Sequence, residues 1–450
     1  MTQEGNQLKR NKHNVSKLFT ITAVTLMASG IGACADSGND LVDNRFTAPE
    51  WEVLEGMAFV KPAPDSTNAK SDDADAAALG ADLYFERSIA GPVIEDDPHG
   101  WGEVGEVPDM GCQGCHMFPW GSDDRDGDQW PTSLGAKWGH RNSPPVVNVS
   151  FYDFWYWDGS ADSMWRQASA AYENSMQQNG SRLSVAHVLC DQYESRYEAV
   201  FGDLDCEDID TMPAFGKPSK DGSPVPEWDD LTDEQKSKVN WAFINFGKAI
   251  AAYERTLVSG NSPFDQYVAG DYTALSNAQK RGAKLFVGKA GCAGCHNGPG
   301  FTDNDFYNVG VPQVGEHVKE EDTGRIGAIP KLLGSWMNVE GEYSDDPNSG
   351  KLAALNPDDQ TQLGQFRTKH LRQVAETGPY MHTGAVGTLT EVVELYNEPD
   401  ANGNYSGELD GNIIPLNLSS GEIADIVAFL EALTGDIPGD DTWNANKTAY

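Results

Sequence analysis

Two short motifs, far apart in this chain, carry residues whose types and spacing point to one chemistry. Each motif has two cysteines separated by two residues and followed directly by a histidine. This pattern is typical of covalent haem attachment, in which both thiols form thioethers with the haem vinyl groups and the adjacent imidazole becomes the proximal iron ligand. The spacing brings both sulfurs to one porphyrin edge and turns the imidazole under the iron. The motifs predict two c-type haems, haem one on Cys112, Cys115 and His116 and haem two on Cys292, Cys295 and His296.

Helices are the elements that must position these motifs. Apolar residues recur at helical spacing over residues 75–89, 276–287 and 420–434, and the alternation typical of strands is scarce. Glycine and proline punctuate the loops 91–145 and 298–364, which are longer than a compact domain usually allows. Haems that supply part of the core would explain such loops. We therefore expect an all-α fold with two cytochrome-c-like haem domains and long loops packed around the haems.

The chain is expected to divide into a leader, a spacer, two haem domains and a tail. The segments before the two motifs form a weak internal repeat, with Leu79-Gly80 in the first and Arg281-Gly282 in the second. Each motif can therefore lie in its own domain. The expected ranges are 1–33 for a signal peptide, 34–75 for a flexible spacer, 76–245 and 246–436 for the two haem domains, and 437–450 for the tail.

The first 34 residues have the composition of an export signal. A basic stretch precedes apolar and small residues, and the tetrapeptide 31–34 closes the segment at Cys34. This tetrapeptide resembles the bacterial lipoprotein signal, which would make Cys34 an acylated anchor. A plain cleaved secretory peptide is the alternative. We expect a periplasmic protein that is lipid-anchored to the outer membrane.

The charge balance excludes one class of partner. The chain has 69 acidic and 32 basic residues and a net charge of −37. No basic surface is left for a phosphate backbone, so we expect no nucleic-acid binding. After residue 33, no stretch reaches the roughly 20 apolar residues that cross a bilayer. The acidic surface would steer basic small cytochromes toward the chain, or it would reflect a saline habitat.

Segments outside the haem motifs carry a family resemblance. Between about residues 79 and 434 the chain resembles the bacterial di-haem cytochrome c peroxidases, and within them the branch that includes MauG. The resemblance rests on residues 141–148, 156–159, 249–257, 259–261 and 378–384. It implies an enzyme that reduces hydrogen peroxide with electrons from a periplasmic donor, for which the charge favours a basic cytochrome c. Two alternatives stay open: MauG-like oxidation of side chains on a partner protein, and a di-haem electron-transfer cytochrome without catalysis.

The resemblance also implies a sixth ligand for haem two. The standard peroxidases have a distal methionine after the loop that contains His382, and the matching residue here is Tyr396, as in the MauG branch. A phenolate is a hard anionic donor, so it would lower the reduction potential of that haem. Met381 is the alternative ligand, with Tyr396 only packing on a helix. His382 is expected near haem two, bonded to a propionate or to the ligand loop.

Haem one is expected to keep an open position and to bind peroxide. Leu134 stands where the resemblance implies a removable distal histidine, and His140 is an alternative ligand for which a surface role is favoured. The first haem domain would then hold the peroxide site and the second the electron-transfer site. Peroxide cleavage needs a group that moves a proton between the two oxygens. Gln177 replaces the family's glutamate, and an amide can orient peroxide but cannot titrate, which leaves the proton to water or to Glu173.

The resemblance implies two further features near the haems. Trp157 matches a tryptophan that lies between the haems, where an aromatic ring would shorten the electron path, and its alternative role is packing. A calcium ion at the domain interface would be held by the side chain of Asn142 and the carbonyls of Thr377 and Pro379. Amide and carbonyl oxygens suit calcium.

The remaining cysteine pair bears on stability. Cys190 and Cys206 lie outside the haem motifs, in the first expected haem domain. In an exported chain a disulfide is the default expectation, and two free thiols are the alternative.

Overall fold

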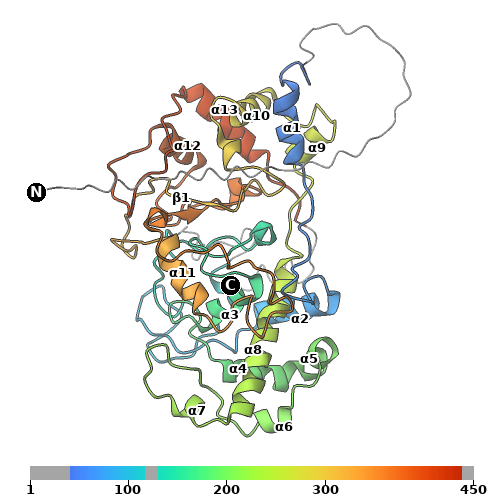
Figure 1. The fold of residues 1–450 in the computed structure, drawn as a ribbon, viewed down its shortest axis with the longest axis vertical. Coiled ribbons are helices and arrows are strands. Elements are labelled where there is room, and N and C mark those ends of the chain that lie inside the picture. The colour runs from blue at the N-terminus through green and yellow to red at the C-terminus, as the bar shows by residue number, and fades with distance from the viewer. Residues whose placement is uncertain (1–40, 117–129, 438–450) are drawn as a thin grey trace, which may run out of the picture. The chain divides into compact units, whose positions relative to one another are not determined.

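The computed structural model describes residues 41–116 and 130–437, and Figure 1 follows the chain through them. The expected signal peptide, the anchor at Cys34 and residues 438–450 of the tail lie outside the described residues. Within the described part the fold is rich in helices, as expected. The sequence did not predict the one small sheet found in the described residues, in which β1 (Phe306–Tyr307) pairs antiparallel with β2 (Phe366–Arg367).

Thirteen α-helices occur in the described residues. They are α1 (Ala48–Gly56), α2 (Ala74–Phe85), α3 (Met164–Glu173), α4 (Arg182–Val188), α5 (Glu194–Phe201), α6 (Cys206–Ile209), α7 (Pro226–Asp229), α8 (Asp233–Glu254), α9 (Pro263–Val268), α10 (Asn277–Val287), α11 (Arg325–Leu333), α12 (Leu389–Asn397) and α13 (Ser420–Glu431). No helix in residues 41–116 or 130–437 is long and apolar enough to cross a membrane.

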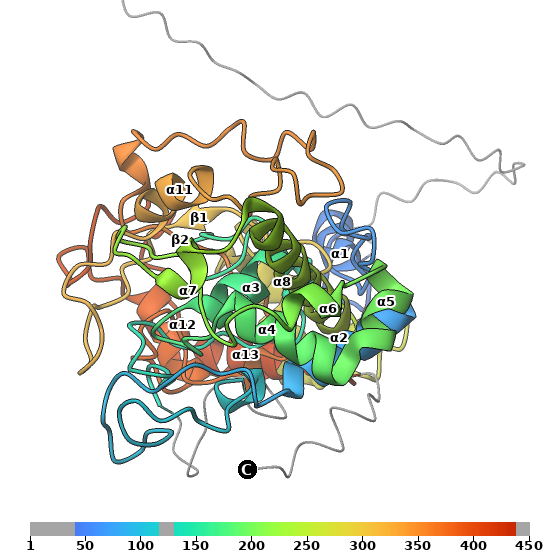
Figure 2. The ribbon, with the colours of Figure 1, turned by 90° about the horizontal axis from the view of Figure 1, so that it is seen from below.

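The first core forms around α8. A capping box between Thr232 and Gln235 starts this helix, and α2, α3 and α4 pack along it (Figure 2). The close approach of α2 requires a glycine, because a Cβ on Gly80 would overlap the backbone carbonyl of Ala249. The expected domain boundary at 245–246 falls inside α8, and the buried residues on both sides of it belong to this core. The boundary is therefore wrong at that position.

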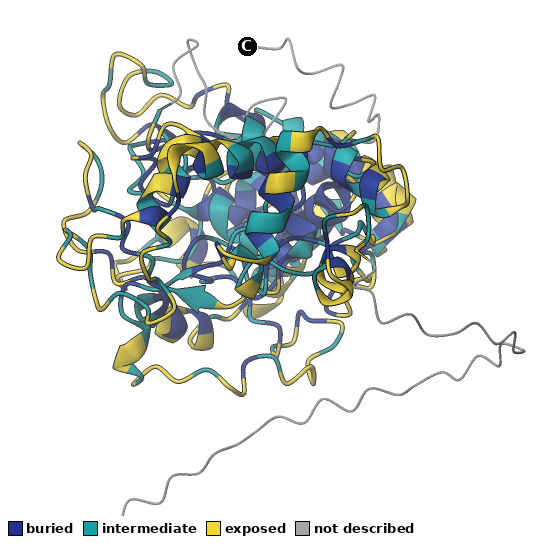
Figure 3. Cartoon of the chain, turned by 90° about the horizontal axis from the view of Figure 1, so that it is seen from above, coloured by how far each residue is buried: buried dark blue, intermediate teal, exposed yellow. Residues whose placement is uncertain are grey.

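The second core also contains a close helix crossing at a glycine. Helix α10 packs on α13, and a Cβ on Gly282 of α10 would overlap the carbonyl of Asp425 on α13. Each of these glycine-bearing helices, α2 and α10, precedes one cysteine motif. The weak repeat read from Leu79-Gly80 and Arg281-Gly282 thus corresponds to two equivalent helix crossings. Figure 3 shows buried residues concentrated along the packed helices and exposed ones along the loops.

Residues 41–75 correct the expectation of a flexible spacer. They contain α1, which starts at a capping box between Thr47 and Glu50, and they bury Phe46, Leu54 and Met57 in the second core. Phe46 also packs on Tyr267, with ring centres 6.3 Å apart. Apolar burial therefore fixes this segment, and a free spacer is excluded from residue 41 onward.

The expected disulfide is confirmed. Cys190 and Cys206 are bonded and link the helical turn after α4 to the start of α6. The four cysteines of the two motifs remain free thiols. They are thus available for the thioether bonds that the motifs predict.

Candidate haem sites

The haem-two motif forms a tight turn directly after α10. The amide of His296 donates to the carbonyl of Cys292 at 2.8 Å, which folds the motif so that the imidazole follows the two thiols. The Nδ1 of His296 donates to the carbonyl of Phe301 at 3.0 Å, since a carbonyl can only accept. This bond leaves the Nε2 lone pair for an iron. Burial lowers the pKa of His296 and keeps the imidazole neutral.

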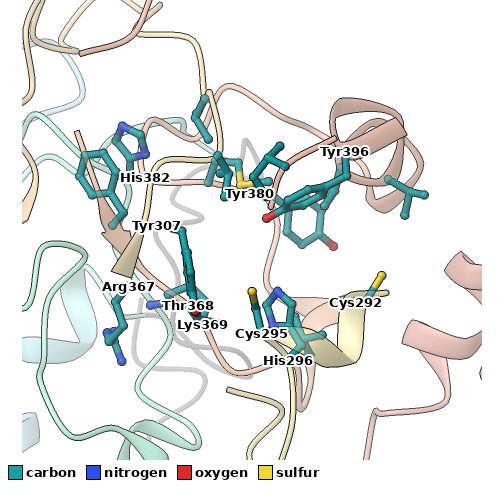
Figure 4. Close-up of a pocket in the computed structure, with 18 of the residues that line it drawn as sticks. Cys292, Cys295, His296, Tyr307, Arg367, Thr368, Lys369, Tyr380, His382 and Tyr396 are labelled. Atoms are coloured by element: carbon teal, nitrogen blue, oxygen red, sulfur yellow. The ribbon is translucent and has the colours of Figure 1, made fainter. Parts of the chain in front are cut away.

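A cavity of about 520 Å³ opens beside His296, within the range of small-molecule and cofactor sites. Figure 4 shows its lining, with the thiols of Cys292 and Cys295 beside the imidazole. Tyr396 of α12 lies on the side of the cavity that faces His296, near Tyr380. Met381, the alternative ligand, lines the same cavity. Burial raises the pKa of Tyr396 well above its ordinary value.

Unpaired buried polar groups show that this cavity fits a haem. The side chains of Arg367, Thr368, Lys369 and His370 line it, and each has a buried nitrogen or oxygen without a hydrogen-bond partner. Burial lowers the pKa of Lys369 and of His370 well below their ordinary values, and that of Arg367 to about 10. Buried cations are unfavourable unless they are paired. The two propionates of a haem would supply the missing negative charge, which also gives His370 a role that the sequence analysis did not foresee.

Trp157 lies in the wall of this cavity. Its Nε1 donates to the carbonyl of Asn142 at 2.8 Å, and its own carbonyl accepts from the amide of Arg367 at 2.9 Å. The Nζ of Lys369 lies 4.3 Å from the indole centre. Trp157 is thus fixed at the haem-two cavity through three contacts, and one of them joins it to the unpaired cations.

His382 also lies at the cavity, and it is neutral. Its ring stacks on Phe366 with centres 3.7 Å apart, and its Nε2 accepts from the side-chain amide of Gln313. Burial, with the charge of Arg141 second, lowers the pKa of His382 to about 3. The backbone carbonyl of His382 accepts from the amide of Asn142 at 2.9 Å.

The three residues expected to hold calcium come together at the same cavity. Asn142, Thr377 and Pro379 all line it, and the side-chain amide of Asn142 donates to the carbonyl of Pro131 at 3.2 Å. In the described part of the chain, no cluster of three or more His, Cys, Asp or Glu side chains could hold a metal ion. The calcium ion stays a prediction.

The haem-one motif folds in the same way after α2. The amide of His116 donates to the carbonyl of Cys112 at 3.1 Å. The side-chain amide of Gln178 donates to the Cys112 sulfur at 3.4 Å, and burial, with the charge of Glu254 second, raises the pKa of that thiol to about 12. The Cys115 sulfur lies 3.7 Å from the carbonyl oxygen of Leu134. Leu134 therefore lies at the haem-one motif.

The other residues expected at haem one make contacts with protein groups outside the motif. Glu173 is buried in a bidentate ion pair with Arg182, with contacts of 2.8 and 3.2 Å. The carbonyl of Gln177 accepts from the amide of Ala136 at 2.6 Å, and it is the next residue, Gln178, whose side chain reaches Cys112. The Nδ1 of His140 donates to the carbonyl of His317 at 2.9 Å.

The sequence analysis missed Glu254 near haem one. This carboxyl group is buried with an unpaired Oε2, and burial raises its pKa to about 8. It acts electrostatically on Cys112 and Tyr84, which places it near the motif. A single acid directly after residues 249–253, which carry no charge, was the available signal.

Comparison with known proteins decides the family. Residues 74–273 match the family described as di-haem cytochrome c peroxidase. A cytochrome-c peroxidase of Denitromonas iodatirespirans is 33% identical over 369 residues, which cover 80% of this chain and 82% of that protein. The chain belongs to the di-haem cytochrome c peroxidase family. It is therefore an oxidoreductase of the peroxidase type, as expected, and the family implies the two haems that the motifs predict.

Other members of this peroxidase family are similar at lower identity. The methylamine utilization protein MauG of Methylorubrum extorquens is 29% identical over 296 residues, which cover 66% of this chain and 65% of that protein. The solved structure of the di-haem peroxidase BthA from Burkholderia thailandensis has a TM-score of 0.58 at 18% identity and covers 84% of this chain and 90% of that one. The structural likeness supports the fold alone.

Proposed function

We propose that this peroxidase binds hydrogen peroxide at an open haem one and receives electrons through haem two. The main support is the position of Tyr396, which faces His296 across the haem-two cavity. At the haem-one motif, the position that the family resemblance gives to a distal histidine is occupied by Leu134. When bound, the haems supply iron that reduces peroxide and passes electrons. The residues around them make the two irons unequal.

Tyr396 is proposed to ligate haem two as a phenolate. In the protein alone, burial raises the pKa of this phenol, but a ferric ion is a large local positive charge that reverses this preference. His296, held by its bond to Phe301, would also hold this iron through its Nε2. Arg367, Lys369 and His370 would pair with the haem propionates. The contacts with the propionates would satisfy basic side chains that the cavity otherwise leaves unpaired.

At haem one, amides are proposed to orient the peroxide. Gln177 and Gln178 follow one another on the segment beside Cys112. The Glu173 carboxylate is already held by Arg182, so proton transfer by Glu173 would require breaking a buried ion pair. We therefore assign Glu173 a positioning role and assign the proton transfer to water held by the two amides.

Trp157 is proposed to carry electrons between the two haems. Trp157 is hydrogen-bonded to the carbonyl of Asn142 and to the amide of Arg367, and all three residues line the haem-two cavity. Calcium bound by Asn142, Thr377 and Pro379 would stiffen the same junction. This arrangement supports a division into one haem domain for peroxide and one for electron transfer, with the boundary after α8 rather than within it.

The donor and the location of the protein follow from charge and from the leader. A basic small cytochrome would be steered to a chain of net charge −37. The export signal and Cys34 favour a periplasmic protein anchored by lipid to the outer membrane. Both features would bring the enzyme and its donor into one compartment.

Tyr396 also supports a second candidate function. An anionic ligand would help haem two to share oxidising equivalents, and the relative named MauG is 29% identical to this chain. The alternative activity is oxidation of side chains on a partner protein.

Peroxide-dependent oxidation of a reduced basic cytochrome c tests the main proposal. The wild-type holoenzyme should oxidise it, replacement of His116 should abolish the reaction of the protein with peroxide, and replacement of His296 should leave peroxide binding but stop turnover. Wild-type protein that consumes no peroxide would contradict the proposal. Peroxide consumption without cytochrome oxidation would favour the partner-protein activity.

A further inference from the structure

A group of aromatic side chains lies beside the haem-one motif and takes no part in the function proposed above. It consists of Trp101, Trp130, Trp138 and His317, all of which are partly exposed. The group comes from three separate stretches of the chain. Its members contact one another or the haem-one motif, so the group extends from that motif to partly exposed positions.

The inner end of the group is Trp101. A Cβ built on Gly114 would lie 2.7 Å from Cζ2 of Trp101, so the indole packs directly on the residue before Cys115. The Nε1 of Trp101 donates to the carbonyl of Leu134 at 3.0 Å, and the Cys115 sulfur lies 3.7 Å from the same oxygen. Trp101 is therefore next to the point where haem one would be attached.

The outer end of the group is Trp138. Leu134, which binds Trp101, pairs with Trp138 in an antiparallel bridge, so one tight turn connects the two indoles. The Trp138 ring stacks on His317 with centres 4.0 Å apart and an interplanar angle of 8°. Trp130 lies 5.3 Å from Trp138. Stacked and tilted rings at these distances form one aromatic surface.

Trp138 has a partner for its proton. Its Nε1 donates to Oδ2 of Asp97 at 2.9 Å, and Oδ1 of Asp97 accepts from the amide of His99 at 2.8 Å. These two bonds lower the pKa of Asp97, so its carboxyl group is ionised at neutral pH. A carboxylate bonded to an indole N–H stabilises positive charge on the ring and can accept the proton when an electron leaves.

The surface around the outer end is acidic. Glu95, Asp96 and Glu103 are exposed on the loop that carries Asp97 and Trp101. Such a surface attracts cationic reductants and repels anionic ones, with rates that fall as salt screens the field.

We propose that Trp101 and Trp138 form an electron route from haem one to the surface, through which cationic one-electron reductants supply the enzyme without using haem two. The proposal rests on the assignment of haem one as the peroxide site. In each cycle, Trp138 gives an electron inward through Trp101 and its Nε1 proton to Asp97. The reductant then returns an electron to the indole, and the proton returns from Asp97. Two cycles oxidise two reductant molecules by one electron each and, with two protons from solvent, convert one hydrogen peroxide to two waters.

Oxidative damage to tryptophan tests the route without relying on turnover. The holoenzyme is treated with peroxide in the absence of reductant, and oxygen addition to each tryptophan is measured by peptide mass spectrometry. Addition should concentrate on Trp138 and Trp130 and should fall several-fold there in Trp101→Phe. The matched control is Trp241→Phe, because Trp241 is 40% exposed and packs on Tyr343, outside the aromatic group. Equal addition at Trp241 and Trp138, or addition only at Trp157, would overturn the route.

A second measurement uses two reductants of opposite charge. Trp138→Phe should lower kcat/KM for hexaammineruthenium(II) several-fold and leave that for ferrocyanide unchanged. Unchanged kinetics with both reductants would also overturn the route. Loss of the high-spin haem signal on peroxide addition is followed in every variant. If peroxide does not remove this signal in wild type, the assignment of haem one fails. If peroxide removes it but oxygen addition to the tryptophans is the same in wild type and Trp101→Phe, only the route fails.

Discussion

The Nζ of Lys369 lies 4.3 Å from the centre of the Trp157 indole, at the wall of the haem-two cavity. Paired with the haem propionates, Lys369 would be a cation, and a cation over an aromatic face makes the ring harder to oxidise. The same Nζ has no hydrogen-bond partner and would face the haem propionates. Lys369 would therefore couple the charge of haem two to the proposed electron carrier.

We predict that Lys369→Met lowers the reduction potential of haem two. Loss of a buried positive charge favours the ferric state. The potential should fall by roughly 50–100 mV, since one charge close to the haem contributes about 1–2 kcal/mol at an effective dielectric constant of about 20. Spectroelectrochemical titration of the holoprotein measures it. Lys319→Met, which removes a lysine on an exposed loop, is the charge-matched control and should change the potential little. Equal shifts in the two variants would refute the role of Lys369.

The glycine crossings give a prediction about stability. Gly80→Ala should lower the free energy of unfolding by about 1–3 kcal/mol, because the new Cβ would overlap the carbonyl of Ala249 and force α2 away from α8. Chemical denaturation followed by circular dichroism measures the change. In Gly421→Ala the new Cβ would meet nothing within 4 Å in helix α13, so this control should be neutral or slightly stabilising. Equal loss in both variants would contradict the packing account.

Glu254 gives a prediction about pH. The pKa of Glu254 is raised to about 8 in the folded protein, above the ordinary value of 4.5, so between these values the folded state holds a proton that the unfolded state has lost. The contribution of Glu254 to stability is therefore complete below about pH 4.5 and is lost as the pH rises through 8. Glu254→Gln mimics the protonated acid and removes this dependence. The Tm of the variant, measured by calorimetry, should match that of wild type at pH 5 and exceed it at pH 9. If the difference in Tm between the two proteins does not change with pH, Glu254 does not titrate in this range.

The parts of the fold that sequence predicted are those with strict local chemistry. The cysteine motifs need fixed spacing, and the glycines of the two helix crossings left a visible repeat at Gly80 and Gly282. The segment with α1 was misread because its composition resembles a linker, although the capping box at Thr47 and Glu50 was a signal for a helix. Its burial depends on contacts with Tyr267, far away in sequence.

In the candidate site, too, residues with a local sequence signal could be predicted, and contacts between residues far apart in sequence could not. Tyr396 and His382 could be placed because they follow a recognisable loop, and both line the haem-two cavity. The pairing of Glu173 with Arg182 and the contact of Gln178 with Cys112 depend on side-chain directions that a single sequence does not encode. The basic side chains of Arg367, Lys369 and His370 become meaningful only when their burial is known.

Exchange of the proposed sixth ligand gives a further prediction. Tyr396→Met should raise the reduction potential of haem two, because a neutral thioether stabilises ferrous iron better than an anionic oxygen does. The variant should also lose any long-lived oxidised state that peroxide forms, because haem two could no longer share it. Redox titration and stopped-flow spectra measure both effects. An unchanged potential would mean that Tyr396 is not the ligand and would favour Met381.

Electron paramagnetic resonance of the oxidised holoprotein tests the central claim most directly, because it reports the spin state of each iron. We predict one high-spin ferric haem and one low-spin ferric haem in wild type, and loss of the low-spin signal in Tyr396→Phe. Tyr380→Phe is the matched control, since the Tyr380 hydroxyl lies at the same cavity but donates to the carbonyl of Val374 at 2.9 Å, and it should keep the wild-type spectrum. Two low-spin signals in wild type that neither peroxide nor cyanide disturbs would contradict the account and favour an electron carrier.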